Sequence, residues 1–144
     1  MNVNESCLID DINPAICVNG RLRRVTRLVN RLYSRHLRAV GISSGQQTIL
    51  FFVGKVKAIE QREIGKRLQL ERSTVTRELN GLVEKGYVIK SEGSQRPVIE
   101  LTSEGARFLN KMVPIWQDAQ NEALELLGRE GDEALNTLLV NTKA

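Results

Sequence analysis

The sequence predicts a single, mainly helical domain that contains one short β-hairpin. Apolar residues recur at spacings of three, four and seven over most of the chain, which is the pattern of helices that bury one face. Aromatic residues make up only 4% of the chain, whereas the helix formers Leu, Glu, Arg and Ala are plentiful. Two β-type runs, "YVIK" and "PVIEL", flank a polar turn, "SEGSQR". With 144 residues, the chain can bury a core without disulfides or a metal.

The N-terminal part of the chain predicts a long helix over residues 13–40. Pro14 suits the first helical turn with Asn13 as the N-cap, and Gly41 is placed to end the helix. Gly20 lies inside the helix and weakens its beginning. The apolar face is formed by Leu22, Val25, Leu28, Val29, Leu32 and Val40.

The central part predicts three shorter helices. In "ISSGQQTILFFVGK", Ser44 and Gln47 fit a capping box, and Gly54 is expected to stop the helix. "EQREIGKRLQL" is short, with two apolar residues four positions apart on one face. The next helix is closed by Gly86, and its apolar face carries Val75, Leu79, Leu82 and Val83.

The C-terminal part returns from the hairpin to helix. Pro97 cannot donate to a strand ladder, so it marks an edge or the start of the second strand. A fifth helix is expected to begin after the cap Thr102, to kink at Pro114 and to end at Gly128. The segment "REGDEALNTLLVN" predicts a sixth, short helix.

Three residues spaced five apart predict how the third and fourth helices meet. Gly65 offers a minimal side chain where two helices cross closely, Leu70 lies in the turn, and Val75 faces inward from the next helix. This combination indicates a helix-turn-helix. The hairpin that follows makes the unit a winged helix-turn-helix core with a two-stranded wing.

The polar face of the fourth helix predicts a DNA-binding site. It carries small hydroxyls and one long cation where a solvated face would carry Glu and Lys. The free N–H groups and the dipole of the first turn favour phosphate. A cation one turn later is placed to reach guanine in the major groove, and one at the wing tip to enter a minor groove. The predicted DNA-binding residues are Ser73, Thr74, Thr76, Arg77 and Arg96.

The alternative for these residues is an ordinary polar helix face and a solvated turn. Arg72 and Asn80 fit either interpretation.

Three stretches resemble the MarR (multiple antibiotic resistance regulator) family of winged-helix regulators. They are "GISSGQQTIL", "LERSTVTRELNGLVEKGYVIKSEGSQRPVIELTSEG" and "VPIWQDAQNEALELLG", the last resembling a branch with Pro-x-Trp-x-x-Ala-Gln in its fifth helix. The resemblance implies a homodimer in which residues 12–41 and 102–144 form a helical dimerisation region. Residues 42–101 would form the winged-helix region that reads double-stranded DNA at a pseudopalindromic operator. It also implies control by a small-molecule effector or by thiol oxidation.

The sequence departs from this family's pattern at two positions. Glu71 stands where the family has Asp before Arg-Ser-Thr, and Glu is a poorer N-cap. Ser94 stands where the family has a wing Asp two residues before the arginine, so we expect Arg96 to lack that orienting carboxylate.

Positive charge is concentrated in the first long helix. Residues 21–41 hold seven arginines and no acid, whereas residues 117–144 hold six acids and two bases. On helical spacing, a basic stripe forms beside the apolar face, and it could face DNA phosphate, an acidic ligand or the acidic tail of a partner subunit. We favour the partner's tail, where Asp118, Glu122 and Glu125 are available. The basic stripe consists of Arg24, Arg27, Arg31, Arg35 and Arg38.

The chemically reactive side chains are few. Cys7 and Cys17 lack the companions of a zinc site, and two reduced thiols are the simplest interpretation. Arg21 lies one helical turn after Cys17 and would favour its thiolate, so a redox switch at Cys17 is the alternative. His36 is the sole histidine and is expected to be structural. Trp116, spaced with Phe108 and Met112, fits a core or dimer seam rather than a ligand pocket.

Several classes of function are excluded by what the sequence lacks. One histidine, no Cys/His cluster and no phosphate-cradling Gly-rich loop argue against an enzyme, a metal site or a cofactor. No apolar run approaches the roughly 18 residues of a membrane span, and the N-terminus does not resemble a secretory signal. We therefore expect a cytoplasmic protein with no membrane partner.

The sequence thus predicts a sequence-specific, DNA-binding transcriptional regulator, a homodimeric repressor released by a small-molecule ligand. One alternative is a thiol-based repressor that senses oxidation through Cys17. A further alternative is a winged helix that binds proteins instead of DNA. The operator, the effector, the choice between repression and activation, and the role of the basic stripe stay open.

Overall fold

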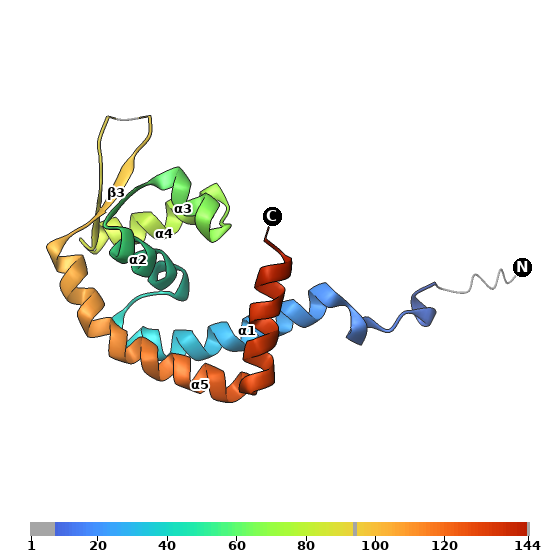
Figure 1. Ribbon diagram of the computed structural model, residues 1–144. Helices are drawn as coiled ribbons and strands as arrows, with labels where there is room; N and C mark the ends of the chain where they lie inside the picture. Colours follow the sequence, from blue (N-terminus) through green and yellow to red (C-terminus); the bar gives the residue numbers. More distant parts are fainter. Residues whose placement is uncertain (1–7, 94, 144) are drawn as a thin grey trace, which may run out of the picture.

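The computed structural model describes residues 8–93 and 95–143, which form a mainly helical molecule with a small antiparallel sheet (Figure 1). The predicted fold class is confirmed. Short 3₁₀ turns occupy Leu8–Asp11, Pro14–Ile16 and Arg38–Val40. The main elements are α1 (Val18–Leu37), α2 (Ser44–Val56), β1 (Ala58–Glu60), α3 (Gln61–Leu68), α4 (Arg72–Glu84), β2 (Val88–Lys90), β3 (Val98–Leu101) and α5 (Ser103–Asn141).

The first long helix starts later than predicted. Asn13 caps only the 3₁₀ turn that contains Pro14, by accepting a hydrogen bond from the Ala15 N–H. Cys17 then has non-helical torsions and becomes the N-cap of α1. Residues 8–28 are all exposed, so no tertiary packing among the described residues extends the helix toward its N-terminus. At the other end, Gly41 (φ 70°) terminates the helical segment as predicted.

Helix α2 differs from its prediction at both ends. The capping box is formed by Ser43 and Gln46 instead of Ser44 and Gln47, so the predicted pair is wrong by one residue. The Ser43 hydroxyl accepts from the Gln46 N–H at 3.0 Å, and the Gln46 side chain accepts from the Ser43 N–H at 3.2 Å. Gly54 does not stop the helix, which continues to Val56. A Cβ at Gly54 would lie 2.6 Å from Leu109, so this glycine allows α5 to pack closely.

The described residues contain one sheet, with three strands in the order β1-β3-β2 and both pairs antiparallel. The β2–β3 hairpin is the predicted two-stranded wing, and it pairs Val88 with Leu101. Strand β1 was not predicted. It pairs Glu60 with Val98 on the other edge of β3 and so joins the wing to the start of α3.

The hydrophobic core lies where the winged helix meets α2 and α5. Trp116 contacts Phe51 edge-to-face, with ring centroids 5.4 Å apart, and Tyr87 stacks on Phe108 at 4.2 Å. Each fully buried aliphatic side chain contributes about 1.5–3 kcal/mol to folding. The largest fully buried side chains are Leu37, Ile49, Leu50, Val53, Ile64, Leu79, Leu82, Val88, Ile99 and Met112.

Helix α5 begins as predicted and breaks at Gly128. The Thr102 hydroxyl accepts from the Gly105 N–H at 2.9 Å and caps the helix. The backbone torsions stay helical through Pro114, and the kink expected at that residue stays a prediction. Pro114 is exposed, and water can bond to the carbonyl that its missing N–H leaves free. The helix breaks at Gly128 (φ 68°, ψ 172°), which confirms the predicted end there and leaves residues 129–141 as a separate helical segment.

Helices α1 and α5 lie side by side, and the winged helix rises from one end of this pair (Figure 1). Leu32 packs against Ala119 and Ala123, whose small side chains allow close approach of the two helices. After Gly128 the C-terminal segment runs in a different direction from the rest of α5 (Figure 1). No helix within the described part of the chain is both long and apolar enough to span a bilayer.

Candidate nucleic-acid interface

The turn between α3 and α4 has the close packing predicted for a helix-turn-helix. The Leu70 N–H donates to the Gly65 carbonyl at 2.9 Å. A Cβ on Gly65 would lie 3.2 Å from the Leu70 carbonyl oxygen and 3.6 Å from a Val75 methyl group. Gln69 turns the chain with a left-handed backbone (φ 52°). The five-residue spacing therefore reflects one contact cluster that fixes α4 against α3.

The outer face of α4 displays part of the predicted DNA-binding set. Ser73 and Arg77 are exposed, whereas Thr74 is partly buried. The Arg77 guanidinium lies 3.4 Å from the Glu78 carboxylate, but its side chain is 70% exposed and only loosely held. Glu71 occupies the N-cap without a side-chain hydrogen bond, in agreement with its expected weakness as a cap. The amide groups at the start of α4 are therefore not capped by Glu71.

Thr76 differs from the other members of the set because its hydroxyl is already engaged. It donates to the Arg72 carbonyl at 3.0 Å and accepts from the Gln61 side-chain amide at 3.2 Å. The other amide atom, Gln61 Oε1, is buried and has no hydrogen-bond partner among the described residues. Gln61 therefore ties the start of α3 to α4. Sequence reasoning missed this residue, and no local pattern marks it.

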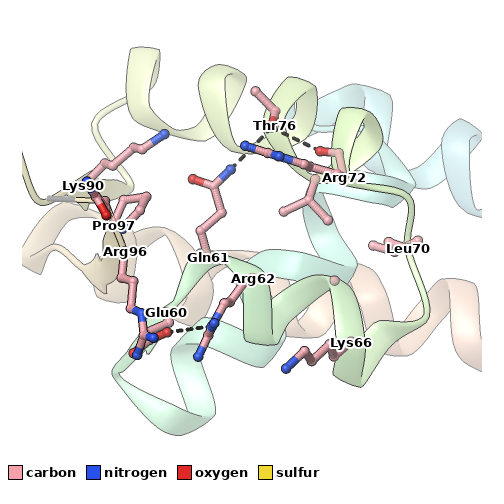
Figure 2. Close-up of a pocket in the computed structure, with 13 residues that line it drawn as sticks. Glu60, Gln61, Arg62, Lys66, Leu70, Arg72, Thr76, Lys90, Arg96 and Pro97 are labelled. Carbon is pink, nitrogen blue, oxygen red and sulfur yellow. Dashed lines mark hydrogen bonds and ion pairs between the residues drawn. The ribbon is translucent and has the colours of Figure 1, made fainter.

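A cleft of about 680 Å³ separates the wing from α3 and α4 (Figure 2). Leu70, Val75 and Pro97 supply apolar surface. Glu60 is the single carboxylate among the described residues that line the cleft. Its cationic side chains are Arg62, Lys66, Arg72, Lys90 and Arg96.

Arg96 does not project away from the wing. Figure 2 shows its side chain directed back across the cleft toward Glu60 and Arg62. The Glu60 carboxylate also lies 2.9 Å from Arg62 Nε. Ser94, where the sequence departs from the family pattern, lies outside the described residues. Arg96 thus faces a carboxylate supplied by β1, which the sequence did not reveal.

One carboxylate beside the cleft is strongly influenced by a cation. The Lys66 ammonium lies 3.1 Å from the Glu63 carboxylate. This hydrogen bond lowers the pKa of the Glu63 carboxyl below its usual value. Glu63 therefore remains ionised and offsets part of the positive charge on α3.

The basic stripe on α1 meets its own chain at one end. Arg35 forms an ion pair with Glu122 of α5, and His36 Nε2 lies 2.6 Å from the other oxygen of that carboxylate. Hydrogen bonds from His36 first and Arg35 second lower the pKa of the Glu122 carboxyl. Glu122 is one of the acids predicted to pair with the stripe of a partner subunit. In this structure it pairs with Arg35 of its own chain. The remaining stripe arginines make no ion pair within the described residues: Arg24, Arg27, Arg31 and Arg38.

The thiol predicted as a redox site is accessible. Cys17 is exposed and unpaired by any disulfide, and its Sγ accepts a hydrogen bond from the Gly20 N–H at 3.4 Å. Cys7 lies outside the described residues. Within residues 8–93 and 95–143, no group of three His, Cys, Asp or Glu side chains is arranged to hold a metal ion.

A comparison with known proteins finds a family that matches this interface. Residues 40–97, which run from the end of the first helical segment to the start of β3, match the MarR family. The winged helix of this chain is thus similar to that of the MarR family. The matched segment includes Gly65, Leu70, Val75 and the whole of α4. It also includes the cleft from Glu60 to Pro97.

Similar proteins share this fold over most of the chain. A mutant of the Escherichia coli MarR protein in complex with operator DNA is 23% identical and has a TM-score of 0.77, covering 96% of this chain and 100% of that one. Bordetella bronchiseptica BpsR, whose DNA binding is regulated by 6-hydroxynicotinic acid, is 17% identical, with a TM-score of 0.79 and coverage of 92% and 98%.

Curated relatives are matched over a smaller part. The HTH-type transcriptional repressor YetL of Bacillus subtilis is 28% identical, over 62% of this chain and 57% of that protein. An HTH-type transcriptional regulator of Bacillus cereus is 23% identical, over 65% and 64%. The chain thus spans less than two thirds of the length of these relatives.

Proposed function

We propose that this MarR-family chain is a transcriptional regulator that binds double-stranded DNA in a sequence-specific manner. The observation that carries the proposal is the exposed face of α4, with Ser73 and Arg77, beside a cleft lined by five cations. Thr74 and Thr76 would contribute from the partly buried side of that helix, and Arg96 from the wing. The operator complex formed by a protein of the same fold supports this proposal.

The proposed assembly is a homodimer that reads a pseudopalindromic operator. Exposed apolar side chains on α1 and at the end of α5 support it, because patches of this kind usually bind a partner. A two-fold dimer is the commonest way to cover them. The exposed residues are Val18, Leu22, Val25 and Leu28 on α1 and Leu135, Leu138, Leu139 and Val140 on α5.

The proposed mode of control is repression that a small-molecule ligand relieves. The repressor name of the Bacillus subtilis relative supports repression. The ligand-regulated DNA binding of BpsR supports a small-molecule effector. A second candidate is a thiol-sensing repressor, which the exposure of Cys17 favours. A mass shift after mild peroxide treatment, with loss of DNA binding that Cys17→Ser abolishes, would select the thiol mechanism.

The deciding experiment is selection of bound sites from random duplex DNA. Recovery of a palindromic consensus would establish sequence-specific binding by a dimer. The logarithm of the affinity should fall linearly with the logarithm of the salt concentration, by about 0.9 per phosphate neutralised. No enriched sequence and no salt dependence would instead favour a winged helix that binds proteins.

A further inference from the structure

Glu60 stands at the corner where β1 passes into α3, directly beside the root of the wing. The β1–β3 register pairs Glu60 with Val98. The next residue, Gln61, donates its N–H to the Pro97 carbonyl at 2.9 Å. These backbone bonds hold the preceding wing residue, Arg96, close to this corner. Figure 2 shows the Arg96 side chain turned toward Glu60.

Helix stability does not account for a glutamate at this position. Glu60 is the N-cap residue of α3, where Ser, Thr, Asp or Asn would bond to the free N–H groups. Its side chain makes no capping hydrogen bond. The carboxylate instead bonds to Arg62 Nε at 2.9 Å and faces Arg96. The Glu60 carboxylate therefore interacts with cationic side chains of the cleft and does not cap the helix that follows it.

The charge of Glu60 opposes that of the surface around it. It is the one carboxylate among the described residues that line the cleft, against five cations. DNA binding without sequence preference depends mainly on the number of phosphates that such cations neutralise. A carboxylate between two arginines competes with phosphate for both and repels a phosphate that approaches.

We propose that Glu60 is a specificity-determining residue that holds Arg62 and Arg96 away from the phosphates of non-specific DNA. This inference rests on the proposed DNA binding. On a wrong sequence, no base contact offsets the loss of the Glu60–Arg62 ion pair or of the electrostatic attraction between Glu60 and the Arg96 side chain turned toward it, so both arginines stay near the carboxylate. On the operator, contacts made by α4 bring the wing against a groove, and Arg96 exchanges Glu60 for DNA. Glu60 thereby weakens non-specific binding more than operator binding.

The test compares Glu60→Gln with wild type on two probes, the duplex selected from random DNA and a duplex of scrambled sequence. Glu60→Gln should bind the scrambled duplex several-fold more tightly. Its salt slope on that probe should steepen by about 1 for each arginine released. The slope on the selected duplex should change less, because Arg96 already contacts that DNA.

Three further variants make the result specific. Glu60→Thr removes the same charge but restores a capping residue, so it should reproduce the DNA phenotype with an α3 that is at least as stable. Glu100→Gln removes an exposed carboxylate of β3 that does not line the cleft and forms no ion pair within the described chain, and it should change the specificity ratio less. In the double variant Glu60→Gln/Arg96→Ala, the part of the gain on the scrambled duplex that comes from Arg96 should disappear, and the part that comes from Arg62 should remain.

Each outcome decides between the inference and the proposed function. A Glu60→Gln protein that binds both duplexes more weakly, or with unchanged slopes, overturns the role of Glu60 but leaves DNA binding standing. A gain that is undiminished without Arg96 overturns the part assigned to that arginine. A wild-type protein that binds neither duplex overturns both proposals.

Discussion

At the scale of single residues, Arg77 and Arg96 differ in what surrounds them. Arg77 stands on the exposed face of α4, whereas Arg96 faces Glu60 across the cleft. We expect Arg77→Ala to cost about 1–3 kcal/mol per half-site and to relax selection at one base pair. Arg96→Ala should cost less, because binding must first separate it from Glu60, and its effect should follow minor-groove width. Repeating the DNA selection with each variant measures both effects.

A suitable control for these variants is Arg107→Ala, an exposed arginine of α5 that lines neither the α4 face nor the cleft. It should leave the selected sequence unchanged. If Arg77→Ala also leaves every operator position unchanged while Arg96→Ala alters one base preference, the two roles have been assigned the wrong way round.

The sequence predicted the positions of the candidate site residues better than their partners. Periodicity and local turn chemistry place Ser73, Arg77 and Arg96 on the fourth helix and the wing. Thr76 accepts from Gln61, however, which lies 15 residues away, and His36 meets Glu122 across 86 residues. Such pairs depend on how helices pack, and a single sequence carries no local signal for that.

At the scale of elements, the contact between α3 and α4 depends on Gly65. A Cβ there would lie 3.2 Å from the Leu70 carbonyl oxygen, so backbone must shift to accept it. We expect Gly65→Ala to destabilise the fold by about 1–3 kcal/mol. Gly20→Ala is the matched control, because its Cβ would meet only ordinary contacts at 3.6–3.7 Å. It should stabilise α1 by about 0.5 kcal/mol. Urea unfolding compares the two, and equal effects would contradict the close crossing.

Element boundaries show where local signals are ambiguous. Ser43 with Gln46 and Ser44 with Gln47 both satisfy the spacing of a capping box, and only the first pair forms it. Strand β1 has three residues, too few for an alternating pattern, and it exists because β3 lies beside it. The turn at Gly65, Leu70 and Val75 was predictable because all three residues belong to one local motif.

The packing of α1 on α5 should depend on pH through Glu122. Its carboxyl pKa is lower in the folded chain because His36 and Arg35 bond to the ionised form. A lowered pKa contributes stability above the unfolded-state pKa, and that contribution is lost as pH falls through the folded-state pKa. Glu122→Gln should therefore be less stable than wild type at neutral pH, and the difference should vanish in acid. Thermal unfolding across pH measures this.

Glu125→Gln provides the comparison for that experiment, since Glu125 is an exposed acid of α5 with no ion pair in the described chain. It should follow the wild-type curve. A Glu122→Gln protein whose deficit persists at low pH would show that packing, and not charge, is responsible.

At the scale of the whole molecule, the proposed dimer should depend on the C-terminal segment. Leu138 is 45% exposed and Leu139 64% exposed in the single chain. We expect Leu138→Glu and Leu139→Glu to shift the protein to a monomer in sedimentation at micromolar concentration, with unchanged helix content. Ile89→Glu alters a wing residue that is 54% exposed and should leave the dimer intact. A wild-type monomer would exclude the proposed assembly.

The break in α5 makes the direction of the C-terminal segment depend on one residue, Gly128. Gly128 has torsions (φ 68°, ψ 172°) that are essentially restricted to glycine. Those torsions set the direction of the C-terminal segment that carries Leu138 and Leu139, which lies far along the chain from α4. In the proposed two-fold dimer, the direction of this segment sets the separation of the two recognition helices. That separation must match half-sites about 34 Å apart. Gly128→Ala should change the distance between the two recognition helices. DNA selected with this variant should therefore show an altered spacing between half-sites whose sequences are unchanged.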